Sequence, residues 1–198
     1  MESSSRKYHE ALEGSPAEEY LVGRGLTREV IQHFRLGYVE SPSANHEKYR
    51  GCLAIPYLTP DGSVTSIRFR NLAGTGTKYL TVPGDMPRLY NAADLVPAYP
   101  RICTTEGELD ACVAKMAGLP VVGLPGANAW RKEWRYVFRQ YDIVYHLADD
   151  DEAGQKMGEQ LQTELDNVRV ITMTGGDVNT YWLEHGSQGL KDRVNGKR

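Results

Sequence analysis

The sequence predicts an α/β protein with two parts: a small α+β subdomain over residues 1–99, then a parallel sheet flanked by helices over residues 100–198. After residue 100, short apolar runs of strand length alternate with helical segments, which is typical of βαβ units and a parallel sheet. Before residue 100, several strands follow one another and are separated by turn residues, as in an antiparallel sheet. A length of 198 residues accommodates two such domains.

The composition is that of an ordinary globular protein, with 40% hydrophobic and 25% charged residues. No apolar run reaches the roughly 20 residues that cross a bilayer, and the N-terminal residues lack the apolar stretch of a secretory signal. The three cysteines are widely spaced and form no C-x-x-C pair, which excludes a disulfide framework and an internal zinc ribbon. We therefore expect a cytoplasmic protein with no membrane partner.

The first half is expected to begin with a frayed tail at residues 1–8 and a helical region at residues 9–26, in which Ser15 and Pro16 form a helix start. Thr27 can cap a second, short helix. A Pro-Asp-Gly turn joins the middle pair of the strands that should follow. These strands are expected at residues 36–39, 51–58, 63–70 and 78–82.

The segment from residue 48 to residue 80 is basic, with five basic residues and one acid, although the net charge of the chain is -3. Arg68 and Arg70 are two positions apart on a predicted strand, so both side chains project from one face. A solvated strand face is the ordinary interpretation of such charges. Their position before an acidic segment favours contact with the phosphates of a nucleic acid or a nucleotide.

The second half repeats strand and helix in alternation, after a connector at residues 96–100. Basic and aromatic residues interleave in one predicted helix and could stack bases, but the helical spacing of Trp130, Trp134 and Val137 favours packing on the sheet. His146 lies on a predicted core strand, which favours a satisfied buried histidine over a metal ligand. The strands are expected at residues 101–105, 120–124, 142–147 and 168–173, and the helices at residues 108–117, 130–140, 152–165 and 179–185.

Carboxylates follow three of the four predicted parallel strands, at the edge where such sheets bind ligands. Glu106 and Asp110 follow the first strand, Asp149 and Asp151 the third, and Asp177 the fourth. Unpaired carboxylates that converge in this way would repel one another, and Mg²⁺ or Mn²⁺ would remove that cost. Complementing a helix dipole is the better interpretation for Glu108 and Glu152, but it does not explain the other acids together.

Residues 106–110 (E-G-E-L-D), residues 149–154 (D-D-D-E-A-G) and the Gly-Asp pair at 176–177 resemble the TOPRIM pattern. TOPRIM proteins include bacterial-type primases, topoisomerases and some nucleases. The order of the E-G-x-x-D and D-x-D-x-A-G motifs is specific, whereas either motif alone would be weak. The resemblance implies a Rossmann-like parallel sheet for the second half.

The first half is similar to the RNA polymerase core of DnaG-like primases. Residues 19–27 look like the Y-L-x-x-R-G-L-T start of that core, residues 34–38 like its F-x-L-G-Y segment, and residues 50–56 like its R-x-x-x-x-P-I region. Arg70 and the Lys78-Tyr79-Leu80 segment resemble its R…K-Y-L-N pair. The resemblance covers roughly residues 15–185.

The resemblance implies a DNA primase core that makes short RNA primers on single-stranded DNA from ribonucleoside triphosphates, with Mg²⁺ or Mn²⁺. By the resemblance, Glu106, Asp149 and Asp151 would be the main metal and catalytic positions, and Asp110 and Asp177 supporting acids. The nucleic-acid or nucleotide contacts would be Arg70 and Lys78, with Arg68, Arg50 and Tyr79. The alternatives are a metal-dependent TOPRIM nuclease and a non-catalytic, nucleic-acid-binding replication subunit.

This sequence departs from the primase pattern in three ways. Asn179 stands where the family often has a second aspartate, and Thr81 stands where an asparagine is expected. A zinc-binding module before the core and a helicase-binding domain after it are not part of the 198 residues. The resemblance therefore implies a phage-like or divergent primase in a bacterial or phage-infected cell, with a replicative helicase or a separate zinc-module protein as partner.

Overall fold

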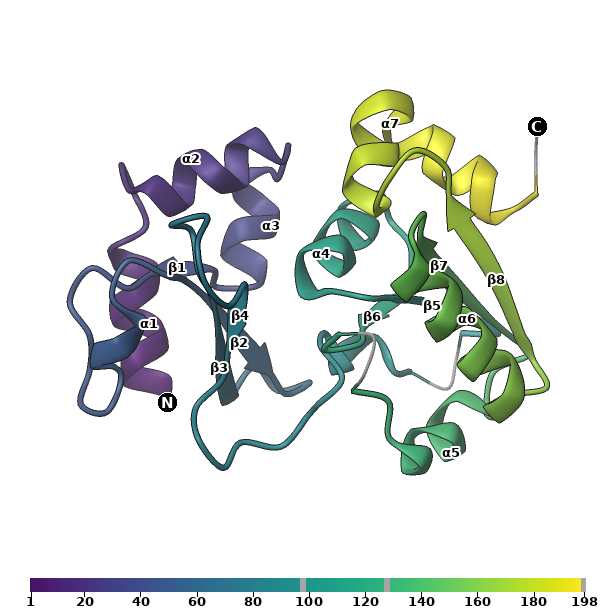
Figure 1. Cartoon of the computed structure of the whole chain (residues 1–198), viewed down its shortest axis with the longest axis horizontal. Helices are drawn as coiled ribbons and strands as arrows, with labels where there is room; N and C mark the ends of the chain where they lie inside the picture. Colours follow the sequence, from purple (N-terminus) through teal and green to yellow (C-terminus); the bar gives the residue numbers. More distant parts are fainter. Residues whose placement is uncertain (97–98, 127–128, 197–198) are drawn as a thin grey trace. The chain divides into compact units, whose positions relative to one another are not determined.

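A computed structural model describes residues 1–96, 99–126 and 129–196, which form two compact units, Met1–Met86 and Pro87–Arg198 (Figure 1). The division falls earlier than the boundary that the sequence predicts at residues 99/100. The reason is that the segment after Met86 belongs to the second unit: Tyr90 forms a backbone bridge with Gly123, and the Asp94 side chain accepts the backbone N–H of Val121 at 3.0 Å. Part of the predicted connector, residues 97 and 98, lies outside the described residues.

The first unit is built on an antiparallel sheet with the strand order β1-β2-β3-β4. The predicted turn between its two long strands is confirmed: the N–H of Gly62 donates to the carbonyl of Thr59 at 2.9 Å, and Gly62 has the positive φ of 84° that glycine adopts without strain. The elements are α1 (Glu2–Glu10), α2 (Pro16–Gly23), α3 (Arg28–His33), β1 (Gly37–Tyr38), η1 (Glu47–Tyr49), β2 (Leu53–Leu58), β3 (Val64–Arg70) and β4 (Tyr79–Leu80).

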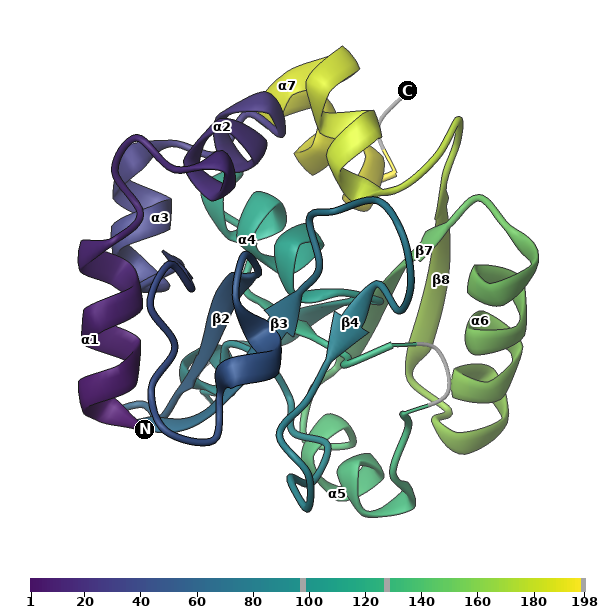
Figure 2. The same cartoon turned by 60° about the vertical axis from the view of Figure 1, so that its left-hand side comes forward.

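The helix starts at Ser15 and Thr27 are confirmed, because the Ser15 hydroxyl accepts the N–H of Glu18 at 3.2 Å and Thr27 accepts the N–H of Val30 at 3.4 Å. The expectation of a frayed tail at residues 1–8 is wrong. These residues form most of α1, which packs against β1, β2 and β3. Figure 2 shows α1 next to β2 and β3. The single helical region expected at residues 9–26 is correspondingly divided, with α1 ending at Glu10 and α2 beginning at Pro16.

Helix α1 is short and polar, so tertiary contacts stabilise it. Tyr8 is 1% exposed, and its hydroxyl is 2.8 Å from Nδ1 of His46 and accepts the backbone N–H of Ser43 at 2.9 Å. Gly37 permits the close approach of the helix, because a Cβ there would lie 2.5 Å from the backbone carbon of Tyr8.

Tyr8→Phe is expected to lower the free energy of unfolding by about 1–3 kcal/mol, because it removes the shared partner of a buried imidazole nitrogen and a backbone N–H. Denaturant unfolding measures the loss. Tyr136→Phe is the matched control: Tyr136 is 61% exposed, so the expected change stays within about 0.5 kcal/mol. Equal stabilities for the two variants would contradict the anchoring role of the Tyr8 hydroxyl.

The second unit is built on a parallel sheet with the strand order β6-β5-β7-β8, as the alternation of strand and helix predicts. Helices α4 and α7 pack together, and α5 and α6 share the hydrophobic cluster on the other face of the sheet (Figure 1). The elements are η2 (Ala92–Asp94), β5 (Arg101–Thr105), α4 (Glu108–Met116), β6 (Val121–Gly123), η3 (Lys132–Trp134), α5 (Arg135–Phe138), β7 (Ile143–Asp149), α6 (Glu152–Glu164), β8 (Val168–Met173) and α7 (Val178–Val194).

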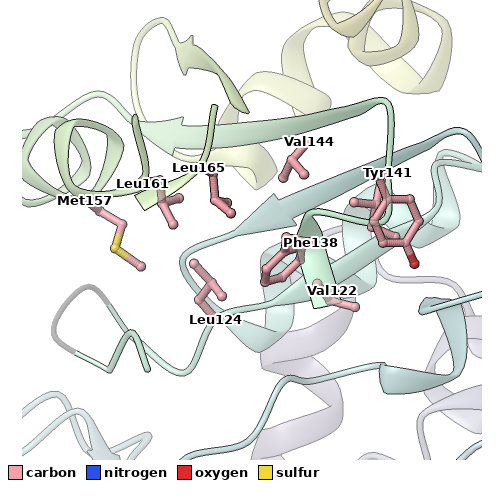
Figure 3. Packing of buried hydrophobic residues seen from close by; sticks show 9 residues of the cluster. Val122, Leu124, Phe138, Tyr141, Val144, Met157, Leu161 and Leu165 are labelled. Atoms are coloured by element: carbon pink, nitrogen blue, oxygen red, sulfur yellow. The ribbon is translucent and has the colours of Figure 1, made fainter. Parts of the chain in front are cut away.

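Two predicted helices differ in length. The helix expected at residues 130–140 is a 3-10 turn followed by one short α-helix, and the helix expected at residues 179–185 continues to Val194 through a kink at Gly186. The predicted packing is confirmed for Trp130 and Trp134, which lie against the core around Phe138, and the Trp130 and Phe138 rings stack at 5.8 Å. Figure 3 shows Phe138 within this core. No helix in the described ranges is long and apolar enough to span a membrane.

Candidate active site and nucleic-acid interface

The parallel sheet brings the predicted acids to one edge of the second unit. Strands β5, β7 and β8 are neighbours, and their carboxyl ends lead into the residues that carry the carboxylates. Glu106 follows β5 directly, Asp149 is the last residue of β7, and Asp177 precedes α7. Asp110 lies in the first turn of α4, and Asp151 is the residue before α6.

Backbone amides fix three of these carboxylates. Oε1 of Glu106 accepts the N–H of Asp149 at 2.9 Å, which ties the end of β5 to the end of β7. Oδ1 of Asp151 accepts the N–H of Gly154 at 2.8 Å, and Oδ1 of Asp177 accepts the N–H of Thr180 at 2.7 Å. Asp151 and Asp177 are therefore helix N-caps, a role that the sequence reasoning assigned to neither residue.

The acids interact strongly across the edge. The pKa of Asp149 is raised to about 8, first because the side chain is largely buried and then because Asp110, Glu106, Asp177 and Asp151 surround it with negative charge. Burial also raises the pKa of Glu106. The hydrogen bond from the Asp149 amide partly offsets this effect, whereas the negative charges of Asp151 and Asp110 raise the Glu106 pKa further. The arrangement thus concentrates charge that a cation would stabilise.

The donor set fits a hard divalent cation, since every candidate ligand is a carboxylate. Oδ1 of Asp149 is buried and has no hydrogen-bond partner among the described residues. Within those same residues, no three acidic, histidine or cysteine side chains already stand as a complete ligand group. The carboxylates lie at one edge of the sheet, and side chains would have to move for several of them to share one ion.

A pocket of about 570 Å³ opens beside Asp149 and Asp151, between α6 and β8. Its position puts space for a ligand next to the carboxylates. Ala148, Asp150, Gln155, Gly158, Glu159, Gln162, Val170 and Thr172 complete its lining.

His146 is fully buried on β7, as the sequence predicts for a core histidine, and burial lowers its pKa to about 4. Its Nδ1 lies 3.0 Å from Oγ1 of Thr104, which is its register partner on β5. Its Nε2 lies 3.9 Å from Oε1 of Glu106 and has no hydrogen-bond partner among the described residues. The prediction of a satisfied histidine is therefore correct for one ring nitrogen only.

The first unit places two of the predicted basic residues beside one tyrosine. The guanidinium groups of Arg68 and Arg70 lie 4.6 and 5.1 Å from the centre of the Tyr79 ring, and Nη1 of Arg70 donates to the Tyr79 hydroxyl at 2.7 Å. Lys78, which directly precedes Tyr79 in the chain, is exposed. Arg50 is also exposed, but its Nη1 donates to the carbonyl of Glu40 at 2.6 Å.

Two further residues, Tyr20 and Arg24, belong to this group of side chains, and the sequence reasoning did not assign them to the interface. Arg70 also lies 5.1 Å from the centre of the Tyr20 ring, and Arg24 lies 5.8 Å from the same ring and donates to the Tyr20 hydroxyl at 3.2 Å. We call the alternating series Arg24, Tyr20, Arg70, Tyr79 and Arg68 the Arg–Tyr ladder. Tyr20 and Arg24 lie in the Y-L-x-x-R-G-L-T motif, which was the available signal.

Solved structures show which class of protein has this fold. The structure superposes with a TM-score of 0.82 on the Aquifex aeolicus primase (zinc-binding and RNA polymerase domains), at 21% identity over 99% of this chain and 59% of that one. It also matches the RNA polymerase domain of Mycobacterium tuberculosis primase DnaG, with a TM-score of 0.82 and 19% identity over 98% of this chain and 80% of that one. The fold is that of a DnaG primase catalytic core.

Sequence relatives place the chain within this class. It is 43% identical over 151 residues to the gene 57 protein of Mycobacterium phage D29, across 74% of this chain and 99% of that protein. It is 26% identical over 186 residues to a DNA primase of Neisseria meningitidis, across 75% of this chain and 31% of that protein. The chain belongs to one family with the phage D29 protein, and its fold and its weaker sequence matches are those of DnaG-like primases.

The chain spans 31% to 41% of the length of the DNA primases that it matches in sequence. A search for a matching protein-family model found none.

Proposed function

We propose that this chain is the polymerising core of a primase, which makes short RNA primers on single-stranded DNA by metal-dependent nucleotidyl transfer. The observation that carries the proposal is the convergence of Glu106, Asp149 and Asp151 at the carboxyl edge of a sheet with the fold of primase cores. In the reaction, the 3′-hydroxyl of the primer loses its proton to solvent, and its oxygen bonds to the α-phosphorus of a ribonucleoside triphosphate. The bond between the α-phosphorus and its bridging oxygen breaks, and pyrophosphate leaves.

Glu106, Asp149 and Asp151 would hold Mg²⁺ or Mn²⁺, and Asp110 and Asp177 would support them. A divalent cation in this position neutralises phosphate charge and lowers the barrier to phosphoryl transfer. The chain's own contribution is placement: the Asp149 amide fixes Glu106, and the first turn of α6 fixes Asp151. Asn179, buried next to the cap of α7, contributes no charge where the family often has an aspartate.

The Arg–Tyr ladder and Lys78 would contact the template or the nucleotide, with Arg50 in a secondary role. Arginines stacked on tyrosines are held in place before binding, so fewer side-chain rotations are lost when phosphates arrive. One solved relative, a DnaG primase catalytic domain, is bound to single-stranded DNA; it matches 99% of this chain with a TM-score of 0.78 and 21% identity. A replicative helicase or a zinc-module protein would be the partner in a bacterial or phage-infected cell.

The decisive experiment measures template-dependent incorporation of labelled ribonucleotides on single-stranded DNA with Mg²⁺ or Mn²⁺, with and without a replicative helicase. The expected result is a series of short RNA products whose synthesis requires both the template and the metal. Shortening of the template without synthesis would identify a nuclease instead. Binding of the template without turnover under any of these conditions would identify a non-catalytic subunit.

Arg70→Ala is expected to weaken binding of single-stranded DNA and to reduce the slope of log affinity against log salt by about 0.7, because one phosphate contact is lost. Fluorescence anisotropy over a range of salt concentrations measures the slope. Arg139→Ala is the control, because Arg139 is an exposed arginine of the second unit outside the ladder. An unchanged slope for Arg70→Ala would show that Arg70 makes no phosphate contact and would contradict a role of the Arg–Tyr ladder in DNA binding.

A further inference from the structure

His146 is a buried polar side chain that the proposed reaction does not use. It is 0% exposed, and its two ring nitrogens have different surroundings. Nδ1 lies 3.0 Å from the Thr104 hydroxyl oxygen, whereas Nε2 points toward Glu106, 3.9 Å from Oε1, and has no hydrogen-bond partner within the described part of the chain. A buried ring nitrogen without a partner costs free energy, so its position calls for a functional explanation.

The tautomer of the His146 ring determines what Nε2 can do, and the Thr104 contact is compatible with either tautomer. A neutral imidazole carries one proton, on either of its two nitrogens. If the Thr104 hydroxyl donates to Nδ1, the ring proton lies on Nε2 and faces the Glu106 carboxylate. Thr104 and His146 are paired by the parallel register of β5 and β7, so the sheet itself holds the ring in this orientation.

We propose that His146 is a positioning residue for Glu106. The Nε2–H and the Asp149 amide together hold Oε1, so that Oε2 of Glu106 is left for the cation. Carboxylates that bind metals are commonly oriented by such outer hydrogen bonds. A shift of about 1 Å would bring the 3.9 Å separation into hydrogen-bonding range. This inference rests on the proposed function, because it requires a cation at Glu106.

Three substitutions separate the two ring nitrogens. In His146→Gln the amide nitrogen can take the place of Nε2, in His146→Asn it can take the place of Nδ1, and His146→Leu removes both. We expect the Asn and Leu variants to bind Mn²⁺ about 10–100-fold more weakly and the Gln variant to stay close to the unaltered chain. Mn²⁺ titration followed by electron paramagnetic resonance measures the affinity, and thermal unfolding establishes that each variant is folded. Folded Asn and Leu variants with unaltered Mn²⁺ affinity would overturn the proposal.

A second measurement needs no variant to fold. Nitrogen-15 spectra of the unaltered chain distinguish a protonated from an unprotonated ring nitrogen, and we expect His146 to carry its proton on Nε2. A proton on Nδ1 would overturn the inference.

Primer synthesis and Mn²⁺ binding by the unaltered chain separate the positioning role from the proposed function. If both are absent, the proposed function fails, and the positioning role fails with it. If both are present and the variants match the unaltered chain, the positioning role alone fails.

Discussion

Asp149→Asn is expected to reduce primer synthesis by at least about 10²–10³-fold while leaving the chain folded. The substitution keeps the shape of the side chain and the backbone amide that holds Glu106, but it removes the negative charge that Asp149 would present to a bound cation. Without metal near pH 7, the melting temperature should stay close to that of the unaltered chain, because a pKa of about 8 leaves Asp149 largely protonated and neutral there. Added Mn²⁺ should raise the melting temperature of the unaltered chain and have much less effect on the variant.

The neighbouring residue supplies the control for this substitution. Asp150 is exposed, and its Oδ2 accepts the backbone N–H of Gly175 at 3.0 Å, a bond that the oxygen of an asparagine can replace. Asp150→Asn makes the same chemical change at the next position and should leave primer synthesis within a few-fold of the unaltered chain. Equal losses in the two variants would show that overall charge, and not the position of Asp149, controls activity.

The acidic edge was predictable from sequence because it depends on topology more than on detail. Once strand and helix alternate, the strands must be parallel and their carboxyl ends must lie together, which places Glu106, Asp149 and Asp177 at one edge without any knowledge of contacts. The side-chain partners were not predictable in the same way. The hydrogen bond from Asp149 to Glu106 and the proximity of His146 join residues 40 or more positions apart.

The features that the sequence failed to predict are those that depend on contacts with distant segments of the chain. Helix α1 has a polar sequence, so its helical state depends on the burial of Tyr8 against the sheet. The alternation of residues on a strand places Arg68 and Arg70 on one face, but only the folded unit shows that the rings of Tyr20 and Tyr79 both lie close to the Arg70 guanidinium group. Local periodicity reports which face a side chain occupies, and it carries no information about what a distant segment brings to that face.

Gly154→Ala is expected to disrupt the acidic edge through a single methyl group. Gly154 is buried in the first turn of α6, and its N–H holds Asp151. A Cβ at this position would lie 2.7 Å from Oε1 of Glu106 and would also collide with the backbone carbonyl of Asp149. Glu106 is tied to the Asp149 amide, and Asp149 ends a strand of the parallel sheet, so neither can move away without cost. We expect a loss of about 1–3 kcal/mol in the free energy of unfolding, typical of overpacking.

The same collision should displace Glu106, so primer synthesis and Mn²⁺ affinity should fall further than the loss of stability explains. Measurements at a temperature where the variant is fully folded separate the two effects. Gly23→Ala is the matched control: Gly23 is the last residue of α2, and a Cβ there would have no atom within 4 Å. That change should be neutral or stabilise the chain by about 0.4–1 kcal/mol, because alanine has less conformational freedom in the unfolded state. A Gly154→Ala chain with unaltered Mn²⁺ affinity would show that Glu106 can bind the cation from another position, and the close packing at the start of α6 would then serve stability alone.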